Sequence, residues 1–313
     1  MVRAVCSVRA LKHNIRTLNS LNQDIIPVVT NRVFNHGGRV LKEISRSYRY
    51  QPLYVHDRAD AAYLRANEVD NIIIQQVWDG KDYDRVIPVL TASQVAQYDT
   101  AKPFAVVSDY RFNVGGVSAR IIPKDSNLAY VFFQSPVDNV PIDLTLGLQE
   151  TIAEYKAINP NVKISIGSSV DALNGSGLLP RVCSPLLGYG KIQDGKKYLR
   201  PVKEVYADVI CKLQSASADH EGTNHYNIGI GSSDGIHEGY IARSAVYEGH
   251  IMRALERSIY INHSTIESDV ILGEGASLHI IGGEARRASA GMPFNLGRLI
   301  AELLVGNPEC PYT

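Results

Sequence analysis

One stretch decides the fold: Pro27-Val28-Val29-Thr30-Asn31-Arg32-Val33-Phe34-Asn35-His36-Gly37-Gly38. An apolar run from Ile25 to Val29 ends in small polar residues, a His-Gly-Gly turn follows, and residues 40–44 continue at helical spacing. This order predicts a strand, a loop at its carboxyl end and a helix, the repeating unit of α/β barrels. In such barrels the residues just after a strand face the active site. Residues 30–36 are therefore the first candidates for chemistry.

The composition indicates a folded protein without a dominant charge. The 313 residues include 32 Lys+Arg and 32 Asp+Glu, so no long-range field favours nucleic acid or an anionic membrane. No apolar run reaches the roughly 18 residues of a membrane span, and Met1–Cys6 lacks the apolar core of a signal peptide. The four cysteines are scattered without a C-x-x-C pair, which favours a reducing compartment over a zinc site. We expect a cytoplasmic protein without a metal.

Strand-like and helical patterns alternate through the first part of the chain. Short apolar runs recur at 53–55, 72–74, 86–90, 104–107, 128–133, 162–166 and, more weakly, 181–187. Helical patterns separate several of them, at 59–69, 92–98 and 143–158. The alternation predicts a (β/α)8 TIM-type barrel over residues 9–195, in which some helices are short or missing because the spacing is tight. An open doubly wound sheet is the alternative, although no G-x-G-x-x-G motif follows a strand.

The pattern changes after Gly190. Residues 191–200 are polar and rich in turn formers, which is typical of a linker. Beyond them, strand-like runs are separated by Gly and Asp turns, at 202–213, 226–230, 257–261 and 276–281, before a helical pattern at 296–304. We expect a mainly β domain over residues 196–313. Residues 1–8 alternate like a strand, and we expect this strand to join that domain.

The order of elements resembles the alanine racemases, the fold type III pyridoxal-phosphate enzymes. Collinear segments carry the resemblance: Leu11–Ile15 is similar to A-L-x-H-N-I, Pro27–Gly37 to the cofactor-lysine motif V-V-K-A-N-A-Y-G-H-G, Leu187–Gly190 to the end of R-x-G-x-x-x-Y-G, Ile228–Gly235 to I-G-Y-A-D-G, Gly273–Gly282 to G-D-x-V-x-L-I-G, and Asn307–Tyr312 to R-V-P-R-x-Y. The resemblance implies an N-terminal barrel, a C-terminal β domain and a homodimer with shared active sites.

The residues that carry the family's chemistry do not match. On this alignment the Schiff-base lysine falls on Thr30, which cannot form an imine. The tyrosine that reaches the cofactor phosphate falls on Phe34, and the arginine facing the pyridine nitrogen falls on Cys183. The tyrosine that acts as second base from the partner subunit falls on Ser232. A weaker local alignment places the family's substrate arginine on Val114 and its ring histidine on Phe132. Racemisation through a pyridoxal Schiff base is not expected.

The sequence does match the family's phosphate-binding site, which we call the phosphate corner. Ile166-Gly167-Ser168-Ser169 lies at a predicted strand-to-helix turn, where backbone N–H groups hold anions without a particular side chain. Tyr312 matches the family's terminal phosphate tyrosine. We therefore expect Ser168, Ser169 and Tyr312 to contact a ligand.

Four residues are candidates for catalysis. His36 could act as an acid or base at the barrel mouth, or could simply bond backbone at a helix start. Cys183, expected to point to the barrel centre, could be a nucleophile or a buried inert thiol. Ser232 could touch a ligand across the subunit interface, and His263 could supply an acid or base there. The candidate substrate-binding residues are Thr30, Arg32, Phe34, Asn35, Arg111, Phe132, Ser168, Ser169, Asn262 and Tyr312.

These observations leave three functions open. The first is an enzyme without a cofactor, of isomerase, cyclase or lyase type, acting on a small molecule in a specialised biosynthetic pathway. The second is a non-catalytic relative that binds a metabolite or regulates a partner. The third is a pyridoxal enzyme that uses another lysine; Lys163, at the start of a predicted strand, lies at the wrong end for that role. The first is the function that we expect.

Overall fold

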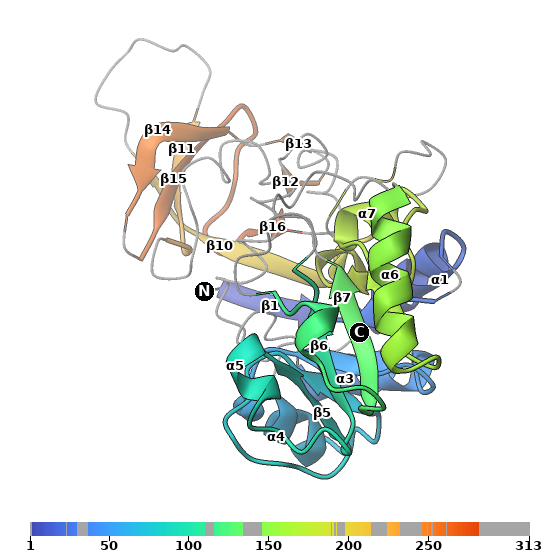
Figure 1. Ribbon diagram of the computed structural model, residues 1–313. Helices are drawn as coiled ribbons and strands as arrows, with labels where there is room; N and C mark the ends of the chain where they lie inside the picture. Colours follow the sequence, from blue (N-terminus) through green and yellow to red (C-terminus); the bar gives the residue numbers. More distant parts are fainter. Residues whose placement is uncertain are drawn as a thin grey trace.

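The chain forms a parallel barrel followed by an antiparallel β domain (Figure 1). The computed structural model describes residues 2–22, 24–29, 37–109, 116–133, 146–188, 190, 192, 198–213, 224–231, 246–248, 250–251, 253–260 and 262–281.

The barrel contains eight described parallel strands: β2 (Ile26–Pro27), β3 (Leu53–Val55), β4 (Ile73–Gln75), β5 (Val86–Leu90), β6 (Phe104–Val107), β7 (Leu128–Phe133), β8 (Lys163–Ile166) and β9 (Arg181–Val182). Strands β3 to β8 form one sheet in sequence order, and β2 pairs with β9. Two links close the ring. Val28, which follows β2, bridges Tyr54 of β3. The backbone N–H of Arg181 in β9 donates to the carbonyl of Gly167, which follows β8 (3.3 Å). The predicted TIM-type barrel is confirmed.

Several connections of the barrel are short, as the tight spacing predicts. Full helices follow β2, β3 and β7: α3 (Gly37–Ser47), α4 (Arg58–Ala66) and α6 (Leu146–Ile158). Shorter ones follow β5, β6, β8 and β9: α5 (Ala92–Val95), η1 (Ala119–Ile121), α7 (Ser169–Leu173) and η2 (Ser184–Leu187). Residues 76–85, which join β4 to β5 and are all described, contain no helix.

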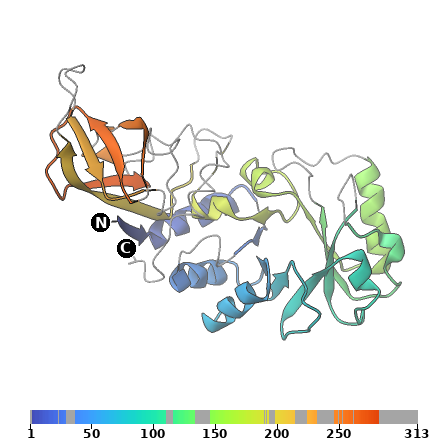
Figure 2. The ribbon, with the colours of Figure 1, turned by 90° about the vertical axis from the view of Figure 1, so that its left-hand side faces the viewer.

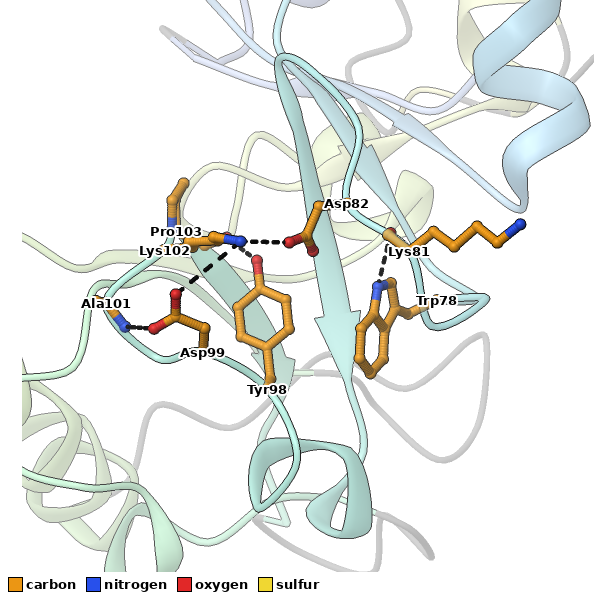
Figure 3. A network of polar contacts seen from close by, with 8 residues as sticks. All are labelled: Trp78, Lys81, Asp82, Tyr98, Asp99, Ala101, Lys102 and Pro103. Atoms are coloured by element: carbon orange, nitrogen blue, oxygen red, sulfur yellow. Dashed lines mark hydrogen bonds and ion pairs between the residues drawn. The ribbon is translucent and has the colours of Figure 1, made fainter.

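Aromatic side chains cover the barrel where this helix is missing (Figure 3). The Trp78 and Tyr98 rings meet edge to face with centres 5.3 Å apart, and Tyr98 packs in turn on Phe104 of β6. The Trp78 ring N–H donates to the Lys81 carbonyl (2.9 Å). Beside these rings the ammonium nitrogen of Lys102 lies 2.6 Å from a carboxylate oxygen of Asp82. Large rings with one polar end suit a half-buried position of this kind.

Successive residues of each barrel strand face opposite sides. In β3, Tyr54 packs inside the barrel with Ile26 and Ile74, whereas Leu53 and Val55 pack outside, in the core that the helices share. That outer core includes residues of α1 (Val8–Asn19), α3 and α4. A second outer core joins strands β5 to β8 to α6.

Within its described residues, the β domain forms an eight-stranded sheet built on β10 (Lys203–Leu213). The other strands are β1 (Val2–Cys6), β11 (Asn224–Ile228), β12 (Val246–Tyr247), β13 (His250–Ile251), β14 (Arg253–Ile259), β15 (Ser264–Ser268) and β16 (Ser277–Ile281). Strand β1 pairs antiparallel with β10, from Val2 opposite Ala207 to Cys6 opposite Lys203. Figure 2 shows β10 running from this domain toward the barrel.

A buried asparagine joins helix α1 to both parts. The Asn14 amide donates to the carbonyls of Leu186 (3.0 Å) and Arg200 (2.7 Å), and its oxygen accepts from the Arg200 N–H (2.7 Å). Gly188 lies beside this junction with φ +95°, and a Cβ there would meet the Arg200 carbonyl oxygen at 2.0 Å. Two segments of the alanine racemase resemblance therefore meet where the barrel ends and the β domain begins.

Candidate active site at the barrel mouth

Arginine 181 occupies the barrel interior on the last strand. Its neighbour Val182 packs in the outer core, so Arg181 faces inward by alternation. The guanidinium carbon lies 5.3 Å from the Tyr54 ring centre and 5.1 Å from the Phe132 ring centre. The two rings meet edge to face, 5.3 Å apart. The result is a cation held against aromatic faces inside the barrel, an arrangement that is favourable where water is excluded.

The phenol of Tyr54 shares this environment. Burial raises the pKa of Tyr54 above its ordinary value, and the positive charge of Arg181 opposes part of the rise. Tyr54 is therefore a neutral hydroxyl at physiological pH and cannot serve as a general base there.

Histidine 56 lies one inward position above Tyr54, toward the mouth. Val55 faces the outer core, so alternation turns His56 to the same side as Tyr54. The pairing of β3 with β4 continues here, because the Val77 N–H donates to the His56 carbonyl (2.8 Å). The His56 Nδ1 lies 3.5 Å from Oε1 of Gln76, which follows β4. An exposed histidine at the carboxyl end of a barrel strand is a candidate acid or base.

The predicted phosphate corner holds a carboxylate of the chain itself. Asp171, 5% exposed, accepts from the Ser168 N–H (2.7 Å) and from the Ser168 hydroxyl (3.2 Å). Gly167 has φ +107°, and a Cβ there would lie 2.8 Å from the Asp171 Cβ. Glycine is therefore required at the turn that brings Asp171 to the start of α7.

The 3₁₀ helix η2, which also lies at this corner, offers few backbone N–H donors. After the last two strands, TIM barrels frequently bind phosphate at loops and a short helix. Here η2 begins at Ser184 and contains Pro185, which has no N–H, and the Leu186 N–H donates to the Cys183 carbonyl (3.1 Å). The residues described at this corner do not fit a phosphate group, because Asp171 brings a negative charge and its own acceptor oxygens.

Ser169 and Cys183 touch each other at the same place. The Ser169 hydroxyl accepts from the Cys183 N–H (3.2 Å), tying α7 to the end of β9. Cys183 has φ −124° and ψ −90°, so the extended strand has ended and alternation no longer applies. Its half-buried side chain packs against the outer core. The prediction that Cys183 points to the barrel centre is corrected by this packing: the inward residue of the strand is Arg181.

Three further candidates are described. Phe132 is fully buried in the barrel interior beneath Arg181. Asn262 and His263 lie on the hairpin between β14 and β15, where the His263 ring stacks on Tyr260 with centres 4.5 Å apart. Tyr260 is 52% exposed, so this hairpin presents an aromatic surface to its surroundings. The remaining candidates lie outside the described residues: Thr30, Arg32, Phe34, Asn35, His36, Arg111, Ser232 and Tyr312.

Sequence reasoning missed Arg181 and His56, although each had a signal. His56 directly follows the apolar run Leu53–Val55, the same position relative to a strand that singled out Thr30. Arg181 begins a weak apolar run in which a charged residue is unusual. Within the described part of the chain, no group of three or more His, Cys, Asp or Glu side chains could hold a metal ion. No helix in that part is long and apolar enough to cross a membrane.

The closed barrel and the β domain built on β10 together define an alanine racemase-like fold. The alanine racemase of Acinetobacter baumannii is 14% identical with a TM-score of 0.76, covering 100% of this chain and 99% of that one. The enzyme of Corynebacterium glutamicum is 14% identical with a TM-score of 0.75, covering 98% and 97%. That of Bartonella henselae, solved with covalently bound pyridoxal phosphate, is 16% identical with a TM-score of 0.72, covering 100% and 99%. No protein-family model and no curated protein matches this chain in sequence.

Proposed function

We propose that this chain is an enzyme that acts on a small molecule without pyridoxal phosphate, by isomerase, cyclase or lyase chemistry in a specialised biosynthetic pathway. Its structural relatives are enzymes named as alanine racemases. The fold supplies the same barrel mouth, and barrels change chemistry by changing the residues that follow their strands.

The carboxylate of Asp171 carries the proposal. It occupies the start of α7 and accepts both the N–H and the hydroxyl of Ser168. A phosphate bound there would lie against a buried negative charge, and like charges at close range repel strongly where the dielectric constant is low. A cofactor anchored by its phosphate is therefore disfavoured at this corner.

The lysines give independent support. Lys163 is the one lysine in the eight described barrel strands, and it is the first residue of β8. Its ammonium lies 5.6 Å from the Tyr130 ring centre, at the amino end of the barrel. Active sites of such barrels lie at the opposite end. A pyridoxal enzyme that uses Lys163 is therefore disfavoured, and the sequence has Thr30 at the family's position.

His56 and Arg181 supply the polar groups that acid–base chemistry needs. Strand β2 pairs with β9 and is bridged to β3, so the two residues flank β2 about 10 Å apart across the sheet, with His56 nearer the mouth. A small substrate over the end of β2 would meet a cation on one side and an imidazole on the other. We propose His56 as a proton donor or acceptor, beside the earlier candidates His36, Ser232 and His263.

The proposal also includes a homodimer with shared sites. The hairpin that carries Tyr260, Asn262 and His263 projects an exposed ring from the β domain. Tyrosine and histidine with apolar bodies and polar tips are suited to an interface that is completed by a second copy.

The test is an absorbance titration of the purified protein with pyridoxal phosphate, followed by borohydride. We expect no imine band in the wild type, and the same result for Lys163→Ala. A band that borohydride abolishes would overturn the proposal. Thr30→Lys combined with Asp171→Asn is the positive control, since it restores the lysine and removes the charge at the corner. A metabolite screen for turnover would then separate catalysis from binding: tight binding without turnover, unaffected by His56→Gln, favours the non-catalytic alternative.

A further inference from the structure

We infer that helices α1 and α3 form a docking surface for an acidic helix of a partner protein. Both helices pack against the outside of the barrel, in the same outer core. The surface is separate from the proposed active site, and the inference does not depend on the proposed function.

The two helices carry the same pattern of charge. Residues 9–16 read R-A-L-K-H-N-I-R and residues 39–46 read R-V-L-K-E-I-S-R, so both follow R-x-L-K-x-x-x-R. Helix positions three, four and seven residues apart lie on one face. The leucines of the pattern, Leu11 and Leu41, are buried in the outer core, so the cations lie at the surface. We call these cations the basic face: Arg9, Lys12, Arg16, Arg39, Lys42 and Arg46.

The cations of the basic face form two neighbouring rows. Helices α1 and α3 are adjacent (Figure 2), and the ammonium nitrogen of Lys12 on α1 lies 3.5 Å from a carboxylate oxygen of Glu43 on α3. Axes of packed helices lie about 10 Å apart, and two arginines seven residues apart on a helix are separated by about 10 Å along its axis. The basic face therefore presents charge over an area that a third helix could cover.

The charge of the basic face is only partly compensated. The carboxylates of Glu43 and Glu68 pair with Lys12 and Lys42, at 3.5 and 2.9 Å. No carboxylate of the described residues pairs with three of the arginines, which are Arg9, Arg16 and Arg46. The whole chain has 32 Lys+Arg and 32 Asp+Glu, so the excess of positive charge is local.

This repeated pattern stabilises neither helix. Like charges three or four residues apart repel each other on a helix, and both helices have such cations in succession. An anionic partner would remove the repulsion, and complementary charge would guide it to this face. The pattern is therefore explained by binding rather than by folding.

The geometry favours an acidic helix over nucleic acid or an anionic membrane. A helix with carboxylates three, four and seven residues apart presents them at the spacing of each row. Single-stranded nucleic acid needs free aromatic faces on which bases stack, but the exposed rings of Tyr50 and Tyr198 each have an arginine over them already, at 4.5 and 5.5 Å from the ring centre. Membrane binding needs apolar side chains that insert, whereas the members of both rows are cations.

Anisotropy titrations with a labelled helical peptide test this inference. The probe is an alanine-based peptide with two repeats of E-x-x-E-x-x-x-E, and its control has the same composition with glutamate at every second position, which spreads the charge around the helix. We expect the protein to bind the probe more tightly than the control, and less tightly as salt is added. The triple variant Arg9→Gln, Arg16→Gln, Arg46→Gln should bind the probe about tenfold more weakly or worse.

A second triple variant is the matched control, because it removes the same charge from exposed lysines elsewhere on the barrel: Lys81→Gln, Lys124→Gln and Lys156→Gln. It should bind the probe like the wild type. Replacement of the three arginines by glutamate should abolish binding of the probe and create binding of the same peptide with lysine in place of glutamate. This exchange of specificity would not occur in a protein that had merely failed to fold.

Equal weakening by the two triple glutamine variants, or equal affinity for the probe and its control, would overturn the inference. Tighter binding of oligouridylate or of phosphatidylserine vesicles than of the probe would also overturn it, since the face would then belong to nucleic acid or a membrane. Self-association of the wild type that the arginine variant loses would assign the face to a second copy of this chain instead. None of these outcomes bears on the pyridoxal-phosphate titration that tests the proposed function.

Discussion

The Asp171 carboxylate lies 2.7 Å from the backbone nitrogen of Ser168, and this contact defines the corner of the barrel mouth. The carboxylate and the Ser168 hydroxyl form a capping box, since the Val170 N–H donates to Ser168 Oγ (3.3 Å) while Asp171 accepts from the Ser168 N–H. The same contact thus starts helix α7 and places a negative charge where the family resemblance predicts a phosphate.

Asp171→Ala should lower the free energy of unfolding by about 1–2 kcal/mol, because the Ser168 N–H and hydroxyl lose their acceptor in a buried place. Urea denaturation measures the change. Asp70→Asn is the control, since Asp70 is exposed, and it should leave stability unchanged within error. A loss no larger for Asp171→Ala than for Asp70→Asn would show that the capping box does not stabilise the corner.

Trp78→Ala should destabilise the barrel by about 1–2 kcal/mol, because it removes the ring that packs on Tyr98 where no helix covers β4 and β5. Lys102→Met should have little effect, since the Lys102–Asp82 pair is exposed to solvent. Both variants can be compared by thermal unfolding. If Lys102→Met were the more damaging change, the ion pairs of Figure 3 rather than the rings would hold this face.

Alkaline pH should destabilise the protein through its buried tyrosines. Burial raises the pKa of Tyr155 to about 12, and raises those of Tyr48 and Tyr54 above their ordinary value. Each group ionises in the unfolded chain at about pH 10 but not in the folded protein. The contribution of these tyrosines to the free energy of unfolding is therefore fully present below pH 10. It falls as the pH rises toward 12, by at most about 1.4 kcal/mol per pH unit for each tyrosine.

Tyr155→Phe provides the matched variant for this pH dependence. The Tyr155 hydroxyl donates to the Val117 carbonyl and lies 3.2 Å from the Ser108 hydroxyl, so its removal should cost about 1–2 kcal/mol at neutral pH. The variant should also lose less stability between pH 10 and pH 11 than the wild type does. Identical slopes would mean that Tyr155 does not titrate with unfolding in that range.

Tyr260→Ala should weaken the proposed dimer, because it removes the exposed ring stacked on His263. Tyr50→Ala is the control, since Tyr50 is 81% exposed after helix α3 of the barrel, away from the hairpin. Sedimentation at several concentrations would report the dissociation constant of each variant. A wild-type protein that is monomeric throughout, or equal effects of the two substitutions, would contradict the shared-site arrangement.

The strands of the barrel were predictable because their apolar runs are short and bounded. Runs 53–55, 86–90 and 128–133 coincide with β3, β5 and β7. The strand predicted over residues 181–187 was wrong beyond Val182, since only Arg181 and Val182 extend the sheet. Residues 184–187 form a 3₁₀ helix because Pro185 cannot donate a hydrogen bond to a neighbouring strand. Strand β15 (Ser264–Ser268) was missed, since its polar residues satisfy their groups through contacts such as Ser264 Oγ to the Ile230 carbonyl (2.6 Å).

The candidate site was less predictable than the fold. Alternation shows which side of the sheet a residue faces, but only for residues within the strand, so the position at which the strand ends must be known. Cys183 was assigned to the interior because the family's arginine falls on it in the alignment, whereas the strand ends at Val182 and its inward residue is Arg181. The turn at Gly167 was predicted, but the contact of Asp171 with the Ser168 N–H, which places a carboxylate at this corner, was not.

The helix-free connection between β4 and β5 has a practical consequence. Trp78, which covers that edge, is the only tryptophan of the 313 residues. Trp78 lies on the same loop as Gln76, whose side chain lies 3.5 Å from His56 Nδ1. Fluorescence excited at the indole band therefore reports on this single edge of the barrel in the unmodified protein, without a label.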